Sequence, residues 1–174
     1  MKKLSIFLLF FLLCSSVGYS QDAGYTFTMK KDLACTSVKN QNQSSTCWCF
    51  SGISFFESEL MRMGKKEYDL SEMFIVRHIY ENKADRYVRM HGSCTFSGGG
   101  EYHDLLNATR EYGLVPDNVY PGLNYGDVKH NHNEMDGALK GYIDAVVKNA
   151  KLTTAWFNGF NGILDAYLGE MPGD

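Results

Sequence analysis

The sequence predicts a mainly helical chain, of the kind that forms one half of a two-lobed α+β protein. Apolar residues recur at helical spacing in five stretches, whereas the alternation typical of strands is scarce. Gly64, Gly113 and Gly169 follow three of these stretches, where glycine commonly ends a helix. The 174 residues, 44% of them hydrophobic, suffice for about one domain.

Residues 1–20 have the pattern of a secretory signal. Lys2 and Lys3 precede an apolar run from Leu4 to Leu13, and a small, polar end follows that suits signal-peptidase cleavage after Ser20. The run is shorter than the roughly 20 residues of a membrane span. We therefore expect a periplasmic or secreted protein without stable membrane association after cleavage. An uncleaved N-terminal anchor, or lipidation at Cys14, is the alternative.

The charge argues against a nucleic-acid partner. The formal net charge is −3, and cleavage after residue 20 would remove two lysines and no acidic residue. No stripe of lysine and arginine, on which phosphate binding relies, occurs in the rest of the chain.

The elements follow in order along the chain. Residues 21–42 are polar and predict an extended lead-in with at most one short strand. The hydroxyl run Ser44–Thr46 is expected to cap the first helix, and Asp69 or Ser71 the second. Loops are expected at 91–100 and 118–133. The apolar pattern predicts helices over 47–63, 71–89, 101–112, 135–148 and 153–168.

Cys47 is the candidate nucleophile because it stands where the first predicted helix begins. A helix N-terminus favours a thiolate through its dipole and its free N–H groups. An acyl-transfer cysteine also needs donors for the oxyanion, and the N–H of Cys47 with the side-chain amide of Gln41 or Gln43 could supply them. It further needs an imidazole that shares the thiol proton.

The residues around Cys47 resemble those of papain-like cysteine peptidases. Gln41 precedes the Cys47–Trp48 pair by six residues, as in that family, although Ser44 replaces a structural cysteine and Thr46 a small residue. The run Ser-Ser-Thr-Cys-Trp is similar to the bleomycin hydrolase and aminopeptidase C branch. Further segments that resemble this branch are Leu70-Ser71-Glu72, Gly99-Gly100-Glu101-Tyr102, Gly113-Leu114-Val115-Pro116 and Tyr120-Pro121.

This resemblance implies an α+β, papain-like two-lobed peptidase, of which the chain holds mainly the helical left lobe. It implies a left lobe over 21–133 and a helical insertion over 134–174. Cys47 would then be the nucleophile, Gln41 the preferred oxyanion donor, and Gly99, Gly100 and Trp48 substrate-binding residues. The substrates would be peptides cut from the N-terminus, with no cofactor and no metal. A homo-oligomer is compatible with these features.

The catalytic histidine is expected beyond residue 174. In papain-like enzymes it follows the cysteine by roughly 130 residues, and the insertion takes up many of those that remain. We therefore expect a truncated chain that lacks the catalytic histidine and asparagine and turns over substrate poorly alone. None of the chain's own histidines is expected to act as the base; they are His78, His91, His103, His130 and His132.

Other interpretations remain open. The chain could belong to a non-catalytic papain-like binding protein or to a papain-like endopeptidase. A zinc site of Cys47 and Cys49 with His130 and His132 matches no common motif, and a solvated loop better explains the two histidines. Cys49 is expected to be a small buried hydrophobic residue. The disulfide pairing of Cys35, Cys49 and Cys94 is left open.

Overall fold

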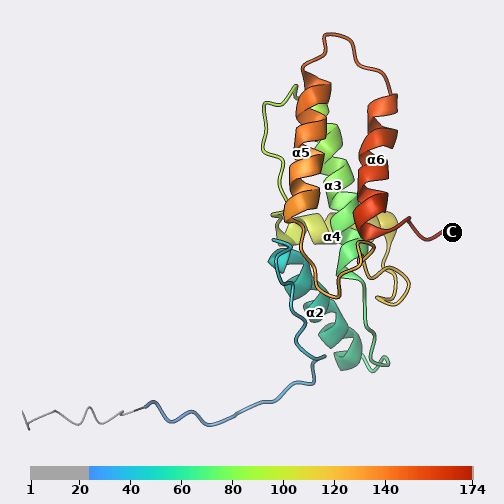
Figure 1. Ribbon diagram of the computed structural model, residues 1–174. Coiled ribbons are helices and arrows are strands. Elements are labelled where there is room, and N and C mark those ends of the chain that lie inside the picture. The colour runs from blue at the N-terminus through green and yellow to red at the C-terminus, as the bar shows by residue number, and fades with distance from the viewer. Residues whose placement is uncertain (1–23, 174) are drawn as a thin grey trace, which may run out of the picture. The chain divides into compact units, whose positions relative to one another are not determined.

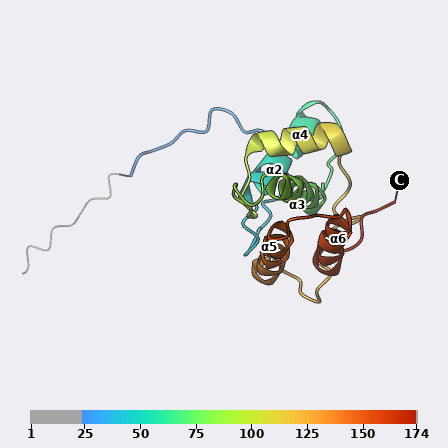
Figure 2. The same cartoon turned by 90° about the horizontal axis from the view of Figure 1, so that it is seen from above.

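Helix α3 (Glu72–Arg89) is the centre of the fold in this computed structural model, which describes residues 24–173. It contacts all four other helices, and Figure 2 shows it between the pair α5–α6 on one side and α2 with α4 on the other. Such a position requires apolar residues around most of the helix. Its buried residues accordingly lie on several faces and include Met73, Ile75, Val76, Ile79 and Tyr80.

Helices α2 (Cys47–Arg62) and α4 (Tyr102–Tyr112) cross closely at a glycine. A Cβ atom on Gly52 would lie 2.2 Å from Cδ2 of Leu105, so only glycine fits this crossing as it stands. Helix α4 begins with a capping box, in which the N–H of Glu101 donates to Oδ2 of Asp104 at 2.9 Å. This contact fixes where the chain leaves the loop that contains Gly98–Gly100.

Helices α5 (Asn133–Val147) and α6 (Ala155–Leu168) form an antiparallel pair joined by a short connection (Figure 1). Each buries apolar residues spaced by four along one face, which is the spacing that places side chains on one side of a helix. These residues belong to the same apolar core as α3. They are Met135, Leu139 and Ile143 on α5, and Phe160, Leu164 and Leu168 on α6.

Residues 24–173 contain five helices and no strand, so the helical character of the prediction is confirmed. Only two isolated β-bridges occur there: Gln43 pairs with Asn131 and Leu70 with Pro116. Residues 24–42, the part of the lead-in that the structure describes, contain no strand, which the prediction of at most one short strand allows. A β lobe, and the boundary predicted at residue 134, remain predictions.

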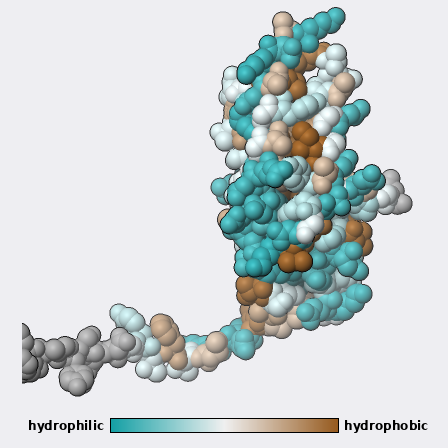
Figure 3. Space-filling model, viewed as in Figure 1, coloured by the Kyte–Doolittle hydropathy of each residue, from teal (hydrophilic) through white to brown (hydrophobic). Residues whose placement is uncertain are grey.

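Residues 24–32 belong to one compact unit. The helices belong to a second unit, which begins at Leu33. They are extended, and Tyr25 and Phe27 are exposed with their ring centroids 6.3 Å apart. The predicted signal, residues 1–20, lies outside the described residues. In the described part of the chain, none of the helices is both long enough and apolar enough to span a bilayer. The surface of the helical unit in Figure 3 is mixed, with small apolar areas set among polar side chains.

Candidate active site

Cys47 is the first residue of α2 and its side chain is exposed. The next two residues, Trp48 and Cys49, are buried, as is Ile53 one turn further on. These buried residues hold the start of the helix against the core while the thiol faces outward. The structure thus places Cys47 at the helix N-terminus, as the sequence predicts.

The hydroxyl run before Cys47 does not cap α2, contrary to the prediction. Thr46 occupies the N-cap position, but its side chain accepts no hydrogen bond from the helix. Its hydroxyl lies instead 2.5 Å from that of Ser44, and both residues are fully buried. The hydroxyls satisfy each other because water cannot reach them.

The N-terminal N–H groups of α2 are therefore left without a side-chain acceptor. The first N–H groups of the helix that find a backbone acceptor are those of Cys49 and Phe50, which both donate to the carbonyl of Thr46. Among residues 24–173, no hydrogen bond uses the N–H of Cys47. This N–H is free to donate to a ligand oxygen near the thiol.

Gln41 and Cys47 line one pocket of about 300 Å³. The Oε1 atom of Gln41 is buried and has no hydrogen-bond partner among the described residues. Gln43 does not line this pocket; it is exposed, and its Oε1 accepts a hydrogen bond from Nδ2 of Asn133 at 3.1 Å. Of the two glutamines, Gln41 is the one that shares a pocket with the thiol.

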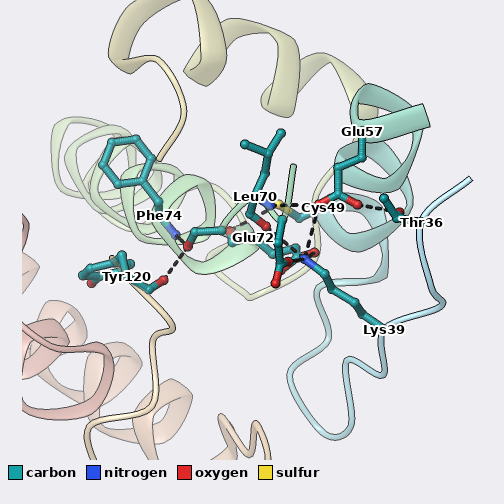
Figure 4. Close-up of polar contacts among 10 residues, drawn as sticks. Thr36, Lys39, Cys49, Glu57, Leu70, Glu72, Phe74 and Tyr120 are labelled. Carbon is teal, nitrogen blue, oxygen red and sulfur yellow. Dashed lines mark hydrogen bonds and ion pairs between the residues drawn. The ribbon is translucent and has the colours of Figure 1, made fainter. Parts of the chain in front are cut away.

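A cluster of charged side chains, Lys39, Glu57 and Glu72, lines part of this pocket, and Figure 4 shows the polar contacts among them. The Nζ atom of Lys39 lies 2.6 Å from Asp69, 3.0 Å from Glu72 and 3.4 Å from Glu57. Burial lowers the pKa of Lys39, but the hydrogen bonds to Asp69 and Glu72 and the nearby carboxylates outweigh this effect and raise it. Lys39 therefore stays charged.

Glu57 and Glu72 are almost fully buried members of the cluster. Glu57 accepts hydrogen bonds from the hydroxyl of Thr36 at 2.6 Å and from the N–H of Leu70 at 2.9 Å. Burial raises the pKa of Glu72 to about 7, although the positive charge of Lys39 opposes the rise. Glu72 consequently titrates near neutral pH.

Cys49 faces away from the pocket and is fully buried, which confirms its predicted role as a small hydrophobic residue. Its Sγ atom lies 3.4 Å from the carbonyl oxygen of Glu72. Burial raises the pKa of this thiol, and the charge of Glu72 adds to the effect. Cys49 is therefore a protonated packing residue and not a nucleophile.

Trp48 and the glycine run are held together next to the start of α2. The Nε1–H of Trp48 donates to the carbonyl of Gly98 at 3.1 Å, and a Cβ on Gly100 would lie 2.5 Å from Cε2 of the indole. Gly100 thus allows close packing on Trp48, whereas a Cβ on Gly99 would meet only Oγ of Ser97, at 3.9 Å. None of Trp48, Gly99 and Gly100 lines the pocket of Cys47, so their role in substrate binding remains a prediction.

The five histidines lie among the described residues, and none lines the Cys47 pocket. His130 and His132 are not in a solvated loop, which corrects that prediction. His132 is fully buried, and its ring nitrogens find no partner among the described residues. The His130 ring packs edge-on against Phe50, with 6.0 Å between centroids, because this loop turns inward toward α2.

The four described cysteines are all free thiols: Cys35 and Cys47 are exposed, Cys94 is partly buried and Cys49 is buried. Within residues 24–173, no group of three or more histidine, cysteine or acidic side chains is arranged to hold a metal ion. The helical spacing of Cys47 and Cys49 separates their side chains, as expected for residues two apart on a helix.

The sequence analysis missed two features of the site. The Lys39 cluster joins residues far apart in the sequence, and its only local signal is Glu57, a charged residue on the apolar face of α2 one turn after Ile53. The pairing of Gln43 with Asn131 joins two irregular loops and leaves no periodic pattern. Neither contact follows from a motif.

Comparison with known proteins shows which family the sequence resembles. The model of the Peptidase C1-like family matches residues 13–148. The chain is 29% identical to "Aminopeptidase C" of Lactobacillus delbrueckii subsp. lactis over 117 residues, which are 58% of this chain and 26% of that protein. It is 27% identical to "Cysteine proteinase 1, mitochondrial" of Saccharomyces cerevisiae over 107 residues, 52% of this chain and 22% of that protein.

The chain spans only about a quarter of the length of these relatives. "Aminopeptidase C" of Listeria monocytogenes is 25% identical over 107 residues, which are 52% of the chain and 24% of that protein. The matches confirm the resemblance to the papain-like bleomycin hydrolase and aminopeptidase C branch. Because the family model covers more than half of its residues, the chain belongs to the Peptidase C1-like family.

Proposed function

We propose that this chain carries the nucleophile of a peptidase, with Cys47 as the attacking thiol and Gln41 as an oxyanion donor. One observation carries the proposal: the exposed thiol at the start of α2 shares a pocket with an amide side chain that makes no hydrogen bond within the described residues. The atom without a partner is the buried Oε1, an arrangement that is costly for a polar group, and Nε2 of the same amide is the atom that would donate to the oxyanion.

In the proposed reaction, the Cys47 sulfur attacks the carbonyl carbon of the scissile peptide bond. The oxyanion that forms accepts hydrogen bonds from the N–H of Cys47 and from the amide of Gln41. The C–N bond then breaks, the thiol proton passes through an imidazole to the leaving amine, and a thioester remains. Water hydrolyses the thioester, returns a proton to the sulfur and releases the acid.

The imidazole is proposed to come from outside residues 24–173, because none of the histidines there lines the Cys47 pocket. The chain also spans only about a quarter of the matched relatives. We therefore expect the site to be complete only in the protein as its organism makes it.

The proposed activity is that of an aminopeptidase outside the cytoplasm. Relatives named "Aminopeptidase C" and "Aminopeptidase G" support the choice of exopeptidase over endopeptidase. The signal-like pattern of residues 1–20 supports the compartment.

Covalent labelling tests the nucleophile. The protein is treated with a peptidyl epoxide of the E-64 type, and the labelled cysteine is located by mass spectrometry. Label on Cys47 is expected, with none on Cys35, which is also exposed but does not line the Cys47 pocket. Cys35→Ser should label as the wild type does, and Cys47→Ala should not label.

Turnover tests the activity. Aminoacyl amides with a free α-amino group should be cleaved by the wild type and by Cys35→Ser, and not by Cys47→Ala. The same substrates with an acetylated amine should be cleaved poorly by an aminopeptidase and well by an endopeptidase. A protein that binds peptides but cleaves neither form would be the non-catalytic relative, and activity that survives Cys47→Ala would exclude the proposal.

A further inference from the structure

We propose that the residues at the start of α5, His130–Asn133, support the loop before Cys47, and that Gln43 is the positioning residue through which they act. This inference rests on the proposed function, because the loop matters only if it places Gln41 and the N–H of Cys47. We call residues 40–46 the nucleophile loop and residues 130–133 the α5 lead-in.

The nucleophile loop has an uncommon backbone. Asn42 and Ser45 have φ angles of 51° and 58°, in the left-handed region that side chains other than glycine rarely adopt. Asn42 receives local support, because its N–H donates to Oδ1 of Asn40 at 2.8 Å. Conformations of this kind persist only where the surrounding structure fixes them.

Gln43 lies between these two residues and is held by three hydrogen bonds to the α5 lead-in. Its N–H donates to the carbonyl of His130 at 3.0 Å, and its carbonyl accepts from the N–H of His132 at 3.0 Å. Its side-chain Oε1 accepts from Nδ2 of Asn133 at 3.1 Å. Both the backbone and the side chain of Gln43 are thus fixed by one short segment.

The α5 lead-in is itself firmly anchored. The N–H of Asn131 donates to the hydroxyl of Tyr125 at 2.9 Å, and His132 is fully buried. Within α5, Asp136 accepts a hydrogen bond from the hydroxyl of Tyr80 on α3 at 2.5 Å. The central helix therefore holds α5, and α5 presents its lead-in to the nucleophile loop.

The α5 lead-in also packs against a residue that lines the Cys47 pocket. The His130 ring packs against Phe50, which lines the Cys47 pocket one turn after the nucleophile. Figure 1 shows that α5 begins at the end of the α5–α6 pair nearest to α2. The α5 lead-in, which precedes helices predicted from the sequence as a helical insertion, thus contacts both the nucleophile loop, at Gln43, and the first turn of α2, at Phe50.

This arrangement explains why Gln43 occurs two residues after Gln41 without lining the pocket. A side chain that bonds away from the site cannot donate to the oxyanion, but it can fix the backbone from which Gln41 projects. Loss of its contact should therefore slow the chemical step and leave substrate binding nearly unchanged.

The test is a double-mutant cycle in the protein as its organism makes it, with Gln43→Ala, Asn133→Ala and the two combined. Each single variant should lower kcat about threefold to tenfold, the usual effect of one neutral hydrogen bond, with KM within about twofold of wild type. The double variant should be no slower than the slower single variant, because both remove the same contact.

Two inhibitors distinguish misplaced oxyanion donors from a general loss of order around Cys47. A peptide aldehyde forms a hemithioacetal whose oxygen needs the oxyanion donors, so its inhibition constant should rise by the factor by which kcat falls. Alkylation of Cys47 by iodoacetamide does not use those donors, and its rate should stay within about twofold. Asn124→Ala is the matched control: its side-chain amide also bridges two segments, to the carbonyls of Asp165 and Ala166, but not at the loop, and its kcat should be unchanged.

Three results would overturn the inference. One is a kcat within twofold of wild type in both single variants. Another is a loss in Gln43→Ala that Asn133→Ala does not share, since Gln43 would then be the oxyanion donor itself. The third is an equal slowing of iodoacetamide alkylation. Activity in Cys47→Ala would instead refute the proposed function, which keeps the two failures distinct.

Discussion

The Nζ atom of Lys39 lies 3.0 Å from Oε1 of Glu72, and both groups border the pocket that contains Cys47. The ammonium joins a segment just before the nucleophile loop to the first residue of the central helix. This ion pair therefore links the site to the core, and its removal should lower the stability of the fold.

Lys39→Met should destabilise the fold by about 3 kcal/mol at pH 7.5, because it leaves the buried carboxylates without their cation. The loss should be smaller at pH 5, where Glu72 becomes protonated. Urea denaturation at the two pH values measures both quantities. Arg62→Ala, which removes an exposed ion pair with Glu59, is the control and should change stability little. A loss that is the same at both pH values would contradict the titration of Glu72.

Glu72→Gln should change how stability depends on pH. The folded-state pKa of Glu72 is about 7 against an ordinary 4.5, so its protonation stabilises the fold fully below pH 4.5 and ceases to do so as pH rises through 7. As the pH rises from 5 to 7, the free energy of unfolding of Glu72→Gln should increase by about 2 kcal/mol relative to that of the wild type. Urea titrations at several pH values measure the difference, and a difference that does not vary with pH would refute it.

His132 should act in the opposite direction over nearly the same range. Burial, with a smaller effect from His130, lowers the pKa of His132 to about 4. The contribution of the neutral His132 ring to folding stability is complete above pH 6.5 and is lost as pH falls through 4. Lowering the pH from 7 to 5 should therefore reduce the free energy of unfolding by about 2 kcal/mol through this residue. The Glu72→Gln variant lacks the opposing titration of Glu72. Its stability should therefore fall more than that of the wild type when the pH is lowered.

Gln41→Ala should lower kcat by about 10²–10³, the usual cost of one oxyanion donor. The buried Oε1 atom of Gln41 has no partner within the described residues, so truncation removes an unsatisfied group and should not lower the melting temperature. Steady-state kinetics and thermal melting measure the two effects. An unchanged kcat would remove Gln41 from the mechanism.

Gly100→Ala and Gly99→Ala form a matched pair. The new methyl group at Gly100 would overlap the Trp48 indole, and overpacking of this kind costs about 1–3 kcal/mol. The methyl group at Gly99 would make only an ordinary contact with Oγ of Ser97, at 3.9 Å, so stability should hardly change, whereas KM should rise if Gly99 borders the bound peptide. Melting curves and KM values distinguish the two positions, and equal melting temperatures would show that the indole is free to move.

The sequence predicted the helices well because each has a strong apolar period. Helix α2 begins at Cys47, as expected, and Ser71 proved to be the cap of α3, since its hydroxyl accepts from the N–H of Phe74. Gly113, with a φ of 81°, follows α4 as predicted. Local patterns of this kind are visible in a single segment.

The contacts between distant segments were not predictable in the same way. The capping role of Thr46 failed because a buried hydroxyl of Ser44 competes for it. The inward turn of His130 and His132 depends on Gln43, almost ninety positions earlier in the chain. Polar side chains in an irregular stretch carry no periodic signal that distinguishes a buried loop from a solvated one.

The opposite orientations of Cys47 and Cys49 have a consequence for oxidation. A bridge between these thiols would require the first turn of α2 to unwind and Cys49 to leave its place against the carbonyl of Glu72. An oxidant that reaches the outer sulfur therefore finds no partner in the adjacent turn with which to close a disulfide. The sulfenic acid formed there would persist until a small thiol or another protein reduces it, so inactivation by peroxide should be reversible by added thiol.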